Sequence, residues 1–146
     1  MKLREISVWI ARLIVGGLFT YAGVMKLLNP ASFSSSLAGF GILPVGIISP
    51  LALGLPVVEI FFGIAVLAVP ALRRAGTIGL VCLLLTFITV LSWATIAGKK
   101  MECSCFGSDS FLEFGGTVGA LVRNLVMVTM VTYLLVHGYK SERLRS

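Results

Sequence analysis

Residues 47–69 read IISPLALGLPVVEIFFGIAVLAV, an apolar run whose one ionisable side chain is Glu59. A helix that crosses the hydrocarbon core of a bilayer needs about 20 predominantly apolar residues. Three further runs of this kind cover residues 6–28, 75–97 and 117–137. The sequence therefore predicts an all-α protein, a four-helix transmembrane bundle formed by a single integral membrane domain over residues 1–146.

The composition favours a membrane environment over an aqueous one. Hydrophobic residues make up 58% of the 146-residue chain and charged residues 12%, whereas soluble domains carry about 25% charged residues. The net charge of +6 does not indicate a nucleic-acid-binding protein, because the basic residues cluster at the ends of the apolar runs. Arg12 interrupts the first run, which is longer than the apolar region of a signal peptide, so we interpret it as a retained helix.

The distribution of lysine and arginine predicts the orientation of the bundle. Basic residues near membrane spans are enriched on the cytoplasmic side, and eight lie on one side of the predicted helices against two on the other. The first set is Lys2, Arg4, Arg12, Arg73, Arg74, Lys140, Arg143 and Arg145, and the second is Lys99 and Lys100. Both termini are therefore predicted to be cytoplasmic in the inner (plasma) membrane, and the loop before the fourth helix extracytoplasmic.

The first extracytoplasmic loop contains a predicted short amphipathic helix. Asn29 is suited to cap it, with Pro30 at its first position. Phe33, Leu37 and Phe40 then share one face at helical spacing, so the helix is predicted to lie on the membrane surface. The alternative is a partly apolar loop folded over the bundle.

The second extracytoplasmic loop carries the segment ECSCFG (residues 102–107), in which Cys103 and Cys105 are one residue apart. A disulfide needs Cα atoms about 4.4–6.8 Å apart, so this pair closes only if the backbone bends. The small ring is strained and easily reduced, which suits thiol–disulfide exchange in an oxidising compartment. A static disulfide and an unreacted thiol pair are the structural alternatives.

Soft-metal binding is the rival chemistry for the same two sulfur atoms. Two thiolates can hold Cu(I), Zn(II) or a similar thiophilic ion, but a structural zinc site needs four ligands. The predicted extracytoplasmic loops supply no third cysteine and no histidine, so no metal site is assigned. Cys82, in the third predicted helix, is expected to be buried packing, as free cysteines usually are.

Charged residues within the apolar runs mark a second candidate site. Glu59 lies near the middle of the second predicted helix, where an ionisable group normally faces the bundle interior with a partner. Arg123, with Asn124 beside it, is predicted to extend toward Glu59, whereas Lys26 either pairs with Glu59 or extends toward the interface. One interpretation is an ion pair that fixes helix register; the other is a polar pocket that holds a redox carrier or moves protons.

Several of these segments resemble a known family of membrane proteins. The end of the first predicted helix, YAGVMKLLNP (residues 21–30), is similar to the DoxX-like proteins, and so is Glu59 four residues before Gly63. The segment CSCFG (residues 103–107), followed by Arg123 and Asn124, resembles the methylamine-utilisation (MauE) branch of that group. The resemblance covers essentially the whole chain.

The resemblance implies a four-helix membrane protein that works with a periplasmic thioredoxin-like protein in disulfide formation or metalloenzyme maturation. A wider similarity in architecture to four-helix oxidoreductases of the vitamin K epoxide reductase type implies a quinone as electron carrier. The chain departs from that type, since it contains no Cys-x-x-Cys.

The resulting hypothesis is a membrane thiol–disulfide oxidoreductase with Cys103 and Cys105 as its redox pair. Glu59, Arg123 and Lys26 form the supporting polar, cofactor-binding site in this interpretation. A soft-metal binding or transport protein and a non-catalytic assembly factor are the alternatives.

Overall fold

The computed structural model describes residues 2–98 and 116–138, and all regular structure within them is helical. In chain order the elements are α1 (Lys2–Leu28), α2 (Pro30–Phe40), α3 (Val45–Ala68), the 3-10 turn η1 (Pro70–Leu72), α4 (Arg73–Ile96), α5 (Gly116–Tyr133) and the π-helical turn η2 (Leu134–Gly138). Four segments are long and apolar enough to cross a membrane: Leu3–Leu28, Val45–Ala68, Pro70–Ile96 and Val118–Gly138. The predicted all-α fold with four spanning helices is therefore confirmed.

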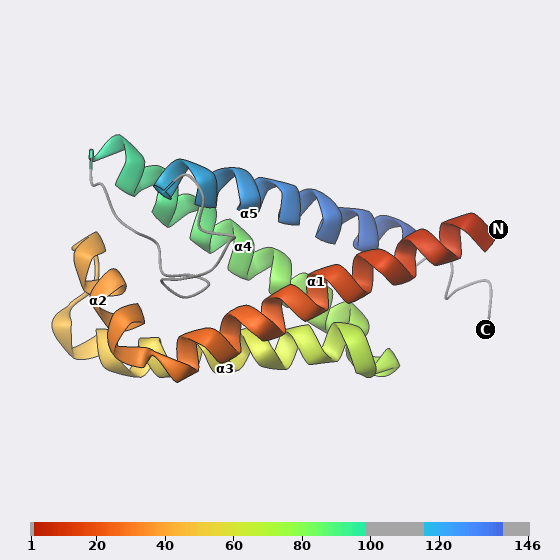
Figure 1. Cartoon of the computed structure of the whole chain (residues 1–146), viewed down its shortest axis with the longest axis horizontal. Helices are drawn as coiled ribbons and strands as arrows, with labels where there is room; N and C mark the ends of the chain where they lie inside the picture. The colour runs from red at the N-terminus through yellow and green to blue at the C-terminus, as the bar shows by residue number, and fades with distance from the viewer. Residues whose placement is uncertain (1, 99–115, 139–146) are drawn as a thin grey trace.

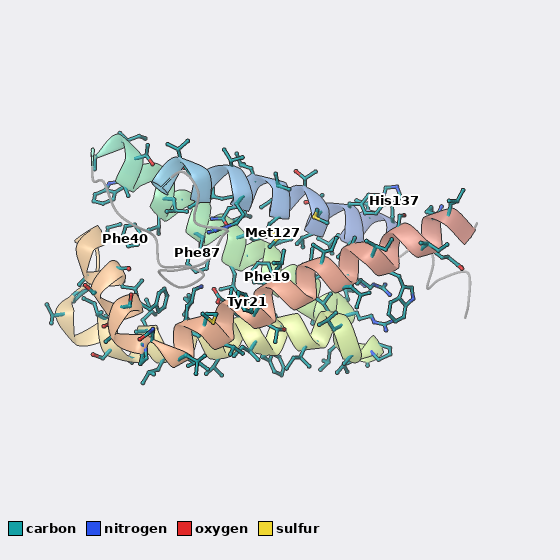
Figure 2. All side chains as sticks on the ribbon, in the orientation of Figure 1. Phe19, Tyr21, Phe40, Phe87, Met127 and His137 are labelled. Carbon is teal, nitrogen blue, oxygen red and sulfur yellow. The ribbon has the colours of Figure 1, made fainter. Side chains whose placement is uncertain are left out.

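The spanning helices form two pairs, α1 with α3 and α4 with α5, and α3 also packs against α4 (Figure 1). The start of α1 and the end of η2 lie together at one end of the bundle, and α2 folds over the other, here called the α2 end (Figure 1). At the opposite end of the bundle, near the start of α1 and the end of α5, the hydroxyl oxygens of Ser7 and Tyr133 lie 2.9 Å apart. The Tyr133 ring stacks on His137, which Figure 2 labels, with 4.5 Å between ring centroids.

The contact between α1 and α3 depends on glycine. A Cβ atom added to Gly23 would lie 2.8 Å from the backbone oxygen of Pro56, and one added to Gly63 would lie 2.6 Å from Thr20 Oγ1. Helices in lipid gain little from hydrophobic burial against one another, so close backbone packing at small residues contributes more to their association.

We expect Gly23→Ala to destabilise the protein by about 1–3 kcal/mol, because the Pro56 backbone cannot move away from the new methyl group without shifting α3. Gly17→Ala is the matched control, since a Cβ there meets nothing within 4 Å. Thermal unfolding in detergent compares the two variants. Equal stabilities would contradict the close α1–α3 contact.

Helix α2 forms as predicted, but its apolar face covers the bundle and not the membrane surface. Phe33, Leu37 and Phe40 are all buried. The first two pack with Ile48 and Ala52 of α3, and Phe40 packs with side chains of α1, α4 and α5. The burial favours the expectation of a segment folded over the bundle.

The two ends of α2 are formed in different ways. Asn29 occupies the N-cap position, yet its side chain makes no capping hydrogen bond. Gly41 ends the helix in the left-handed region at φ 65°, a conformation that glycine adopts without steric cost.

Candidate functional site: a buried ion pair between α1 and α3

Lys26 and Glu59 form an ion pair in the interior of the bundle. Lys26 Nζ donates to Glu59 Oε1 at 2.7 Å and to Oε2 at 2.8 Å. The two residues are only 4% and 1% exposed. Such charge-assisted hydrogen bonds are shorter and stronger than neutral ones, so the two residues connect α1 and α3 through a polar contact that excludes bulk water.

The pair lies deep within the spanning region. Glu59 is fourteen residues after the start of α3 and nine before its end, or about 21 Å and about 14 Å along the helix axis. A charge at such depth is costly unless it has a partner inside the protein, and such residues usually mark functional sites.

Two aromatic rings complete the surroundings of the Lys26 ammonium group. The ring centroid of Phe33, from α2, is 5.1 Å from Lys26 Nζ, and that of Phe87, from α4, is 4.9 Å away. Both distances are within the range of a cation–π interaction. Lys26 is therefore fixed by groups from three helices, a feature that the sequence analysis missed because both phenylalanines fit apolar helix faces.

A small cavity adjoins the ion pair. It measures about 30 Å³ and brings together polar side chains from three helices, Lys26, Glu59, Arg123 and Asn124. Phe19, Phe87 and Met127 form part of its apolar wall and lie between the two helix pairs in the middle of the bundle (Figure 2). A water molecule needs about 10–15 Å³, so one or two waters fit beside the carboxylate.

The structure thus places Lys26, Glu59 and Arg123 at one cavity. Glu59 forms its ion pair with Lys26 in the structure. Lys26 does not extend toward the interface, since it is buried. Arg123 lines the same cavity and also makes an interaction of its own.

The predictions for the three cysteines have different outcomes. Cys103 and Cys105 lie outside the described residues. Cys82 is exposed on α4, so the expectation that it is buried packing is wrong; its helix face is directed away from the protein interior. Within residues 2–98 and 116–138, no group of three His, Cys, Asp or Glu side chains could hold a metal ion.

Comparison with known proteins agrees with the resemblance seen in the sequence. The family described as methylamine utilisation protein MauE matches residues 4–137. The methylamine utilization protein MauE of Paracoccus denitrificans is 28% identical over 129 residues, which cover 88% of this chain and 68% of the relative. No solved structure matches.

Proposed function

The chain belongs to the MauE family of membrane proteins, and we propose that it is a thiol–disulfide oxidoreductase of the inner membrane. In this proposal the α2 end faces the extracytoplasmic side, where Cys103 and Cys105 exchange electrons with a thioredoxin-like protein. The relative is named for methylamine utilisation, and disulfide formation or metalloenzyme maturation for that process is the role that we propose here.

The observation that carries the proposal is the buried Lys26–Glu59 pair and its position relative to the cysteine segment. Residues 99–115 connect α4 to α5, and both helices line the cavity beside the pair. Arg123 is seven residues after the start of α5 and Phe87 nine before the end of α4, or about 10 Å and about 14 Å along the helix axes. The helix ends that the cysteine segment joins are therefore about 10–14 Å along the helix axes from residues that line the polar site.

The chemistry requires a place for protons as well as electrons. The thiolate of one cysteine attacks a disulfide sulfur and forms a mixed disulfide, which a second thiolate then resolves. When a partner's disulfide accepts two electrons from Cys103 and Cys105, the two thiols give up two protons and the partner's sulfurs take up two. Glu59 and the water that the cavity can hold would accept and return such protons near the loop.

A quinone was the carrier implied by the architectural similarity, and the cavity tests its fit. Lys26, Arg123 and Asn124 carry N–H groups that suit a carbonyl oxygen. The cavity of about 30 Å³ is nevertheless much smaller than the about 150 Å³ cavity known to hold a six-carbon ring. The polar cavity does not accommodate a quinone ring, and the proposal assigns none to it.

Partner trapping tests the proposed function. Replacing the resolving cysteine by serine, in Cys103→Ser or Cys105→Ser, is expected to leave the attacking one in a stable mixed disulfide. We expect one of the two variants to accumulate a reductant-sensitive adduct on non-reducing gels, with a thioredoxin-like protein identified by mass spectrometry. The double variant is the control and forms no adduct. Absence of an adduct from both single variants, with full alkylation of the native thiols before reduction, would contradict the proposal.

A further inference from the structure

A second cavity is also lined by Phe87, and its wall is apolar apart from Thr86. It measures about 160 Å³ and is enclosed by α2, α3 and α4. Its wall includes Leu37, Leu51, Leu55, Leu83 and Phe87. This cavity, called the apolar pocket below, is separate from the polar cavity to which the proposed function assigns proton transfer.

The described side chains that line the apolar pocket offer no free hydrogen-bonding group to a ligand. The polar side chain at its rim is Thr86, which is exposed, and its hydroxyl donates to the backbone oxygen of Cys82 at 2.9 Å. The hydroxyl is thus engaged within its own helix. A ligand of this pocket is held by hydrocarbon contacts alone.

The location of the pocket indicates where such a ligand comes from. Both α3 and α4 are membrane-spanning, and residues beside the pocket such as Leu53 and Leu85 are more than half exposed. In a bilayer these exposed side chains are surrounded by acyl chains. A dry apolar cavity of about 150 Å³ takes up a six-carbon ring, so an apolar pocket of this size that borders the bilayer has room for a segment of lipid chain.

We propose that the apolar pocket binds an acyl chain of a bilayer lipid, and that this chain supports the ion-pair site through Phe87. Of the described residues, Phe87 alone lines both cavities, and its ring lies 4.9 Å from Lys26 Nζ. A chain in the pocket packs against the Phe87 ring, which also lines the polar cavity. An acyl chain in the apolar pocket therefore holds the Phe87 ring over the Lys26 ammonium group.

Photocrosslinking tests this proposal on the unmodified protein. The protein is placed in phosphatidylcholine vesicles that contain a phosphatidylcholine with a diazirine on one acyl chain, illuminated and mapped by mass spectrometry. We expect adducts to concentrate on Leu51, Leu55 and Leu83 relative to the exposed Leu125 and Val126 of α5. Equal labelling of both sets would overturn the proposal.

A pair of tryptophan variants adds a matched control. Leu51→Trp fills the pocket, whereas Leu53→Trp, two residues along the same helix, faces outward. We expect loss of the pocket adducts in the first variant and wild-type labelling in the second. Labelling of the pocket residues that persists in Leu51→Trp would contradict the proposed lipid-binding site. The labelling does not depend on thiols, so Cys103→Ser with Cys105→Ser should keep it even if thiol exchange fails.

Discussion

Glu59→Gln is expected to lower the free energy of unfolding by about 3–5 kcal/mol, the usual cost of leaving one member of a buried ion pair without its partner. Lys26→Gln should cost a similar amount, because Glu59 is then left in the apolar interior with its carboxylate unmatched. The double variant should cost clearly less than the sum of the two, since neither charge remains. Thermal unfolding in detergent of the four proteins measures this coupling.

Two controls make the result specific. Glu5→Gln removes an exposed carboxylate from α1 and should change stability by no more than about 0.5 kcal/mol. A double-mutant cycle of Glu59→Gln and Arg123→Gln should give a smaller coupling free energy than the cycle of Glu59→Gln and Lys26→Gln. Lys26 donates both hydrogen bonds to the Glu59 carboxylate. Additivity of the Lys26 and Glu59 variants, or a larger coupling to Arg123, would contradict the observed pairing.

The spanning helices were predictable because bilayer thickness fixes how long an apolar helix must be. Predicted runs at 47–69 and 117–137 differ by only one or two residues from the observed spans Val45–Ala68 and Val118–Gly138. The third span begins earlier than predicted, at Pro70, because the turn η1 leads directly into α4. Hydropathy alone cannot place such a turn.

The partner of Glu59 was harder to predict because the sequence does not show how far each helix extends relative to its neighbours. Lys26 is two residues from the end of α1, yet it contacts a residue fourteen positions into α3. Helix α3 therefore continues beyond α1 at the α2 end, where α2 covers it (Figure 1). This offset brings Lys26, near the end of α1, to the carboxylate in the middle of α3.

The exposure of Cys82 could not be predicted from hydropathy either. In a membrane protein the lipid-facing and buried faces of a helix are both apolar, so hydropathy does not separate them. Helix α4 illustrates this, since Leu84 is 1% exposed and the adjacent Leu85 is 51% exposed. Residue type alone therefore predicted burial for a cysteine that faces outward.

An apolar replacement of the whole ion pair separates its structural role from its proposed chemical role. Buried ion pairs can often be replaced by apolar residues of similar volume with little loss of stability, or with a gain. We therefore expect Lys26→Met combined with Glu59→Leu to fold and to unfold at a temperature close to that of the native protein. Phe33 and Phe87, which now contact the Lys26 ammonium group, would pack against the methionine side chain.

The same double variant is expected to lose thiol exchange, because it removes the one described carboxylate at the cavity that α4 and α5, the helices joined by the cysteine segment, both line. Loss of a positioned proton-transfer group typically lowers a rate by about 10²–10⁴-fold, and we expect at least the lower end of that range. The rate is measured as reduction of the disulfide of an oxidised thioredoxin-like protein by vesicles containing each protein with Cys103 and Cys105 reduced beforehand, with Glu5→Gln as the control. A folded double variant that exchanges at the native rate would assign the ion pair to helix packing alone and leave Cys103 and Cys105 to act without it.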